Sequence, residues 1–181
     1  MKILWIHGKS SRPKIGWTWP IRIEDLQSRW YKIDLPQFDP CEDPTYELWE
    51  KDMSLIDIES YDVIIASSHG SWVFARFVKE NNIHIKRAIF CCPGRSTHRF
   101  RNTGKLYDYL ESHEMNLKNN IDEIFIIHST DDKVVPYSEW IKFQKQIWWN
   151  LVTVEWLWHK LDGTWVRIIN DLATLWRIQK K

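Results

Sequence analysis

Residues 62–71 read DVIIASSHGS. The apolar start of this stretch predicts a buried strand, and the segment 71–80 that follows it predicts a helix. Between the two, small residues stand two positions before and two positions after Ser68, at Ala66 and Gly70. This spacing is typical of a tight strand-to-helix turn that presents a nucleophilic serine. Small residues are required there because the helix backbone passes close to the strand.

The spacing also selects between two neighbouring serines. A turn centred on Ser67 would need small residues at Ile65 and His69, and both of these are bulky. Only Ser68 has small neighbours on both sides. An ordinary strand–turn–helix unit with a serine cap has a similar pattern, however, so the motif alone does not separate a catalytic turn from a structural one.

The composition is that of a folded globular protein, with 44% hydrophobic and 27% charged residues among 181. This length predicts a single domain over residues 1–181. The net charge of +1 argues against nucleic acid or an anionic membrane as the main partner. No apolar run reaches the ~20 residues of a membrane span, and residues 1–7 are too few for a signal peptide. Three cysteines without metal-ligand spacing predict a reducing, cytoplasmic location and no metal.

Apolar runs and helical patterns alternate along the chain, which indicates the α/β class. Strands are expected at 2–6, 31–35, 63–65, 87–92, 122–128 and 152–158. Helices are expected at 17–29, 45–58, 71–80, 104–113, 137–148 and 163–178. Strands that are apolar on both sides suit a parallel sheet covered by helices on both faces.

Candidate catalytic partners follow the later strands. A serine hydroxyl needs an imidazole to take its proton, and a carboxylate to orient that imidazole, in the chain order Ser, acid, His. Asp131 and Asp132 come directly after the fifth expected strand, and His159 comes after the sixth. Because sites form beyond the carboxyl ends of parallel strands, Ser68, one of these aspartates and His159 are expected to form a triad. Asp162 stands too close to His159 in sequence to orient it.

With these residues in place, the chain resembles small single-domain serine hydrolases of the retinoblastoma-binding-protein type within the α/β-hydrolase superfamily. The resemblance rests on four motifs: His7-Gly8 with Gly16-Trp17, Asp34-Leu35-Pro36 with Trp49, the segment 66–70, and Ser129–Asp132 with Pro136. It implies a three-layer α/β/α fold with a six-stranded parallel sheet in the order 2-1-3-4-5-6, little or no cap domain and no cofactor. It also selects Asp132 over Asp131, because the family's aspartate stands four residues before the proline.

The sequence departs from the family at three positions. Ala66 stands where the family has glycine, His69 follows the nucleophile, and Trp158 replaces the usual glycine before the histidine. An oxyanion hole needs two N–H donors. We expect one from His69 and the other from Gly8 or Lys9, in the loop after the first strand.

The expected activity is hydrolysis of a small ester, thioester or amide through an acyl-enzyme. Trp17 and Trp158 are candidates for substrate binding, because they stand close in sequence to the site residues. The main alternative is a catalytically weak protein on the same scaffold that binds a protein partner. A flavodoxin-like binding domain is disfavoured, because the loop after the first strand lacks glycine-rich phosphate-binding spacing. The basic segment 94–105 suits either an anion-contacting flap or a solvated loop.

Overall fold

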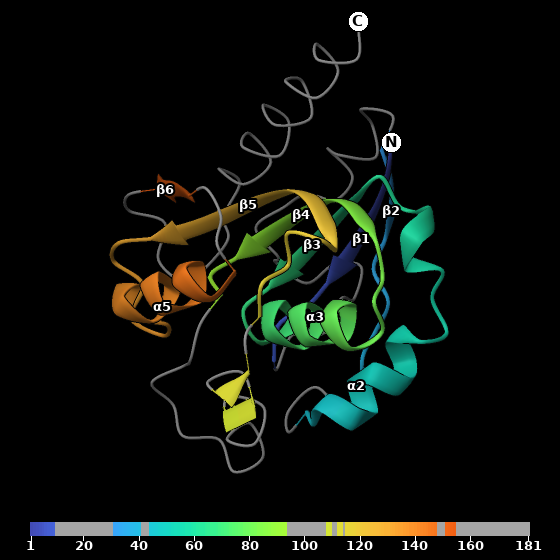
Figure 1. The fold of residues 1–181 in the computed structure, drawn as a ribbon, viewed down its shortest axis with the longest axis horizontal. Helices are drawn as coiled ribbons and strands as arrows, with labels where there is room; N and C mark the ends of the chain where they lie inside the picture. Colours follow the sequence, from blue (N-terminus) through green and yellow to red (C-terminus); the bar gives the residue numbers. More distant parts are fainter. Residues whose placement is uncertain are drawn as a thin grey trace, which may run out of the picture.

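A computed structural model of the protein describes residues 1–9, 31–40, 44–93, 108–109, 112–113, 115–147 and 151–154. These residues form a parallel sheet with the strand order β2-β1-β3-β4-β5-β6 (Figure 1). Its strands are β1 (Lys2–Ile6), β2 (Lys32–Asp34), β3 (Val63–Ser67), β4 (Ile85–Cys91), β5 (Ile121–Ser129) and β6 (Leu151–Val154). The expected α/β fold with the order 2-1-3-4-5 is confirmed, and the short strand β6 pairs with β5 at the edge.

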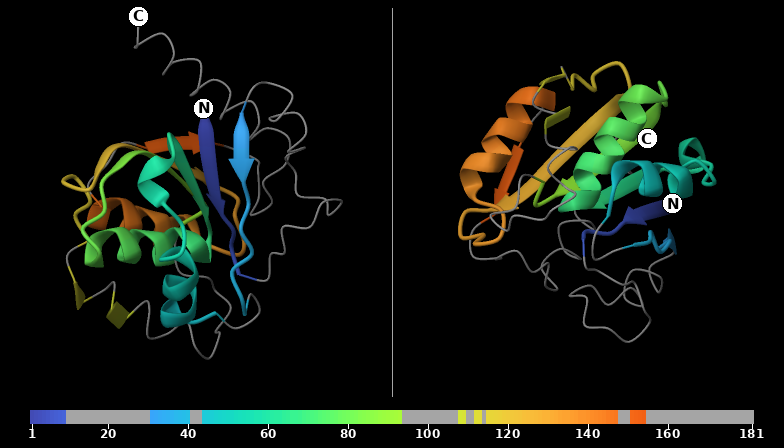
Figure 2. Two further views of the ribbon diagram at one scale, coloured as in Figure 1. Left: turned by 90° about the vertical axis from the view of Figure 1, so that its right-hand side faces the viewer. Right: turned by 90° about the horizontal axis from the view of Figure 1, so that it is seen from below.

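Three helices cover one face of this sheet. They are α2 (Tyr46–Met53), α3 (His69–Glu80) and α5 (Tyr137–Ile147). Figure 2 shows all three on the same side of the strands. The helices expected at 17–29 and 163–178 lie outside the described residues. No helix in the described part of the chain is long and apolar enough to cross a membrane.

Helix α2 is shorter than the expected helix at 45–58. It begins after Thr45, whose hydroxyl accepts a hydrogen bond from the Leu48 N–H at 3.4 Å, as a helix cap requires. It ends at Ser54, whose hydroxyl donates to the Lys51 carbonyl at 2.7 Å. This bond competes with the helical pattern of the backbone. The chain continues as a separate 3-10 turn, η1 (Ile58–Ser60).

Aromatic side chains fill the space between the helices and the sheet. Phe143 of α5 lies 4.5 Å from the Trp72 ring of α3 and 5.3 Å from the Phe90 ring of β4, between ring centroids, in edge-to-face contacts. Such contacts add about 0.5–1.5 kcal/mol to the burial of each pair. The four tryptophans whose burial is described are all inside: Trp5, Trp49, Trp72 and Trp140. These four tryptophans therefore belong to the packed core.

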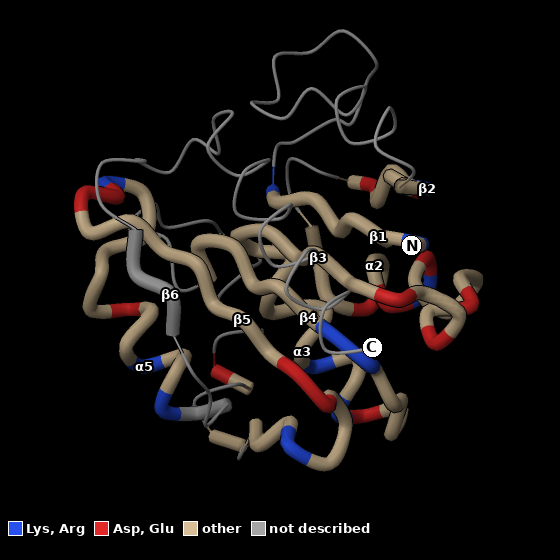
Figure 3. Tube along the Cα trace, turned by 90° about the horizontal axis from the view of Figure 1, so that it is seen from above, with Lys and Arg blue, Asp and Glu red and all other residues tan. Residues whose placement is uncertain are grey.

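Charged residues mark the end of the sheet opposite to the candidate site. Arg87 of β4 and Glu123 of β5 are partners in register near the amino ends of their strands, and form an ion pair at 3.4 Å. Figure 3 shows these charges where β4 and β5 begin, whereas both strands then become uncharged. The apolar half of each strand therefore leads to the carboxyl edge, where the polar site residues follow.

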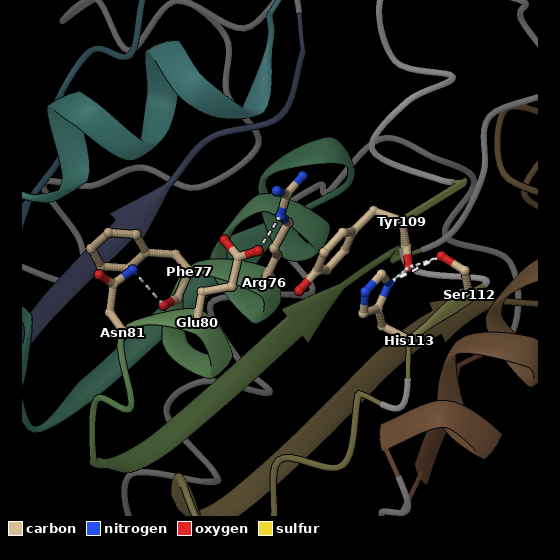
Figure 4. Close-up of polar contacts among 7 residues, drawn as sticks. All are labelled: Arg76, Phe77, Glu80, Asn81, Tyr109, Ser112 and His113. Carbon is tan, nitrogen blue, oxygen red and sulfur yellow. Dashed lines mark hydrogen bonds and ion pairs between the residues drawn. The ribbon is translucent and has the colours of Figure 1, made fainter.

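Cation–π contacts of Arg76 connect α3 with α2 and with Tyr109. The Arg76 guanidinium of α3 lies 3.7 Å from the centroid of the Tyr46 ring of α2 and 3.8 Å from that of Tyr109. It also pairs with Glu80 at 3.1 Å (Figure 4). The Tyr109 ring in turn stacks on His113 at 4.0 Å. The described part of segment 108–113 is thereby attached to α3.

Candidate active site

Ser68 lies in the sharp turn between β3 and α3. Its backbone has φ 50° and ψ −120°, a conformation that is disfavoured for any residue with a side chain. Such a conformation costs on the order of 1–3 kcal/mol and persists only when its surroundings impose it. Here the Ser68 N–H donates to the Cys91 carbonyl at the end of β4, at 2.7 Å. The helix begins at His69, two residues before the expected start at 71, because the turn takes up a single residue.

The Ser68 side chain does not cap the helix that follows it. Ser68 occupies the position before the first residue of α3, yet its side chain makes no capping hydrogen bond. The hydroxyl of Ser67 is buried and accepts a hydrogen bond from Trp5 Nε1 at 3.0 Å. Ser68, by contrast, is only half-buried. Of the two serines, Ser68 therefore has the exposure that a nucleophile needs.

Two glycines allow the loop after β1 to approach this turn. A Cβ on Gly70 would lie 2.3 Å from the His7 carbonyl oxygen, so no larger residue fits without moving the backbone. A Cβ on Gly8 would lie 3.0 Å from Ser68 Cβ and 3.7 Å from Ser68 Oγ. The requirement for a small residue at position 70 is confirmed. Gly8 therefore lies next to Ser68.

His7 fixes the orientation of this loop. Its Nε2 accepts a hydrogen bond from the Phe38 N–H at 2.9 Å, so the proton must be on Nδ1. Nδ1 then donates to the Gly8 carbonyl at 2.8 Å. Burial lowers the pKa of His7, which keeps the ring in this neutral form. Because the carbonyl and N–H of a trans peptide point in opposite directions, the Lys9 N–H points away from His7. Spacing did not predict this role for His7.

The His69 side chain is buried and neutral, and it packs beside the loop. Its ring lies 5.4 Å from that of Trp49 and 4% of the residue is exposed. Burial, with smaller contributions from the charges of Lys9 and His7, lowers its pKa to about 3. The imidazole therefore adds no positive charge near neutral pH. His69 is the first residue of α3, so its backbone N–H stays a candidate donor.

The acid loop after β5 distinguishes the two aspartates. Asp132 is buried, and its Oδ1 accepts hydrogen bonds from the N–H groups of Val134 and Val135 at 2.8 and 2.9 Å. Asp131 is more exposed and accepts a hydrogen bond from the Ser129 hydroxyl within its own loop. A buried carboxylate held by backbone donors suits the orienting acid of a triad.

Two further residues surround Asp132. His128 Nε2 lies 3.7 Å from Asp132 Oδ2 and 3.0 Å from the Val135 carbonyl oxygen. Cys92 follows β4 with φ 47°, and its N–H donates to the Ile127 carbonyl at 2.8 Å. Burial and then the charge of Asp132 raise the pKa of the Cys92 thiol well above its usual range. No motif in the sequence indicates a role for Cys92 or His128.

Ser68 and Asp132 follow strands that lie two apart in the sheet. The link between them is short: Ser68 N–H bonds the Cys91 carbonyl, and Cys92, the next residue, has its sulfur close to the Asp132 carboxylate. Gly8 lies close to Ser68, and His69 is the next residue along the chain. The predicted residues His159, Trp17 and Trp158 and the whole basic segment 94–105 lie outside the described residues.

Comparison with known proteins finds solved structures of the same fold. The chain is similar to the ydeN gene product of B. subtilis, with 20% identity, 96% of each chain covered and a TM-score of 0.75. Mouse alpha/beta hydrolase domain-containing protein 10 matches with 12% identity, 96% of this chain, 89% of that chain and a TM-score of 0.71. A monoacylglycerol lipase of Paleococcus ferrophilus matches with 12% identity, 99% and 95% coverage and a TM-score of 0.65. No family model and no curated protein sequence matches.

These likenesses extend over nearly the whole of the chains that are compared. They agree with the parallel sheet and its strand order 2-1-3-4-5. The protein has the α/β-hydrolase fold.

Proposed function

We propose that the protein is a serine hydrolase that cleaves a small ester, thioester or amide. The observation that carries this proposal is the backbone of Ser68, held at φ 50° directly after β3 without a capping role for its side chain. A strained, half-exposed serine at the carboxyl edge of a parallel sheet is where this fold places a nucleophile. The similar fold of a monoacylglycerol lipase supports an ester as the first substrate class to test.

In the proposed mechanism, Ser68 Oγ attacks the carbonyl carbon of the substrate while His159 takes the hydroxyl proton. The Asp132 carboxylate holds the imidazole in the right tautomer. The negative charge on the substrate oxygen is stabilised by backbone N–H groups. The tetrahedral intermediate then collapses: the bond between the carbonyl carbon and the leaving group breaks, His159 gives its proton to the leaving group, and the acyl-enzyme remains. Water then attacks the acyl-enzyme while His159 takes its proton, and Ser68 Oγ leaves with the proton that His159 returns.

For the oxyanion hole we propose the N–H groups of His69 and Lys9. The His69 N–H is the first of α3 and belongs to the residue after the nucleophile. Lys9 is favoured over Gly8 as the second donor, because His7 bonds the carbonyl of the Gly8–Lys9 peptide and so orients its N–H. Each such donor typically contributes on the order of 10²–10³-fold in kcat. Trp17 and Trp158 stay candidates for contacts with the substrate.

A fluorophosphonate probe tests the proposal directly. We expect covalent labelling at Ser68, followed by mass spectrometry of the labelled peptide. The Ser68→Ala variant should lose labelling and hydrolysis of p-nitrophenyl acetate, whereas Ser67→Ala, changed at the adjacent buried serine, should keep both. Absence of labelling in protein that unfolds cooperatively would refute the proposal and favour a protein-binding role. Equal activity of Ser68→Ala and the native chain would show that another residue is the nucleophile.

A further inference from the structure

The candidate acid Asp132 is itself part of a cluster of possible metal ligands. In the part of the chain that the structure describes, Cys92, His128 and Asp132 each offer a ligand atom, and these atoms lie within 4.8 Å of one another. All three residues are buried, and they come from the end of β4, from β5 and from the acid loop. Thiol, imidazole and carboxylate are the usual protein ligands of zinc.

One pair of these ligand atoms already has the spacing of a tetrahedral metal site, and the whole set lies within 4.8 Å. Metal–ligand bonds of ~2.0–2.3 Å place neighbouring ligand atoms ~3.3–3.7 Å apart. His128 Nε2 lies 3.7 Å from Asp132 Oδ2, and the Val135 carbonyl oxygen lies 3.0 Å from the same nitrogen. Distances of up to 4.8 Å would have to shorten by about 1 Å to bring sulfur, nitrogen and two oxygens around one ion. Asp132 Oδ1 would keep its bonds to the loop N–H groups, which hold the ligand carboxylate in place.

The donor set selects among metals. A sulfur and a nitrogen donor favour Zn²⁺ or Cd²⁺ over Mg²⁺ and Ca²⁺, which prefer oxygen. On binding, the Cys92 thiol would form a metal–sulfur bond and release its proton to solvent, while His128 would shift its proton to Nδ1 so that Nε2 can bind. Because the three side chains are buried, an ion can reach them only after local opening of the acid loop. Binding should therefore be slow.

We propose that Cys92, His128 and Asp132 form an inhibitory site for zinc or cadmium. A bound ion engages the carboxylate that is proposed to orient His159, and so removes the acid from the triad. The inhibitory part of this inference rests on the proposed function, whereas metal binding itself does not. Inhibition should develop over time, be reversed by EDTA, and be absent with Mg²⁺.

The binding test uses cadmium and the full-length chain. Cd²⁺–thiolate coordination gives an ultraviolet charge-transfer absorption, which should rise to one equivalent of Cd²⁺ in the native chain. The band should be lost in Cys92→Ser and weakened in His128→Asn, and it should persist in Cys91→Ser, the matched change at the neighbouring buried cysteine. Circular dichroism confirms that each variant is folded. A band that persists in Cys92→Ser, or no band in the native chain, would overturn the site.

The activity test separates this inference from the proposed function. The native chain incubated with Zn²⁺ should lose p-nitrophenyl acetate hydrolysis by at least ~10-fold, while Cys92→Ser should show the same rate with and without Zn²⁺. Metal binding by a chain without fluorophosphonate labelling would refute the hydrolase and leave the metal site standing. Labelling at Ser68 without a Cys92-dependent cadmium band would refute the metal site and leave the proposed hydrolase standing. A Cys92-dependent band with unchanged hydrolysis would refute inhibition alone.

Discussion

Acidification should destabilise the fold through His69, and the size of the effect follows from its burial. The side chain lies between the oxyanion loop and Trp49, and burial is the main reason that its pKa falls to about 3. In the unfolded chain the same imidazole has a pKa of about 6.5. Between these two values the unfolded chain binds a proton that the folded chain does not. Protonation therefore stabilises the unfolded state relative to the folded state as the pH falls.

The linkage relation gives the magnitude. The free energy of unfolding should decrease by about 1.4 kcal/mol for each pH unit below the unfolded pKa. At about pH 5 the loss from His69 is therefore about 2 kcal/mol relative to about pH 7.5, and it should continue to grow until the pH approaches the folded pKa of about 3. Burial also lowers the pKa of His7, which adds an effect of the same sign.

Urea unfolding followed by circular dichroism at several pH values measures this dependence. In His69→Gln the slope of unfolding free energy against pH should be shallower than in the native chain by the equivalent of one proton. His84→Gln is the matched control, since His84 is exposed and pairs only with the exposed Asp122 among the described residues. An unchanged slope in His69→Gln, with a midpoint that can be measured, would refute the assignment of a buried neutral imidazole.

Three further changes probe the elements around the site. Gly70→Ala places a methyl 2.3 Å from a backbone oxygen, so urea unfolding should show a loss of about 3 kcal/mol; a midpoint equal to that of the native chain would contradict the close approach. His7→Leu removes the donor to the Gly8 carbonyl, so kcat for ester hydrolysis should fall by ~10-fold or more with little change in KM. An unchanged kcat would exclude a positioning role. Arg76→Met keeps the apolar stem but removes the cation between two tyrosine rings, so unfolding should show a loss of about 1 kcal/mol, and no loss would show that the stack is only a contact.

The fold could be predicted from the sequence where side chains have a simple pattern. A strand such as 121–129 is apolar on both faces only when both faces are covered, so runs like IFII predict both the strand and the parallel sheet. The end of α2 could not be predicted, because the pattern of Trp49 and Met53 continues to Ile56. The helix instead ends where the Ser54 hydroxyl bonds a backbone carbonyl, and periodicity does not show such a bond.

The candidate site divides in the same way. The turn at Ser68 and the acid loop at Asp132 are encoded in short local motifs, and the structure places both at strand ends. His7, Cys92 and His128 act through contacts with residues more than 25 positions away or through the register of neighbouring strands. Their only signal in the sequence is their position at the carboxyl ends of three strands. That position marks the three residues as candidates for the site, but it does not show which residues they contact.

The strand order has a consequence for the protein during its synthesis. Strand β3 joins the pair formed by β1 and β2, and β4, β5 and β6 then each add beside the strand that precedes it in the chain. A nascent chain can therefore extend one growing sheet from the ribosome, since each new strand finds its partner already made. The residues proposed for catalysis are spread from the end of β1 to beyond β5. The nucleophile turn can thus form early, while the complete site waits for nearly the whole polypeptide to be released.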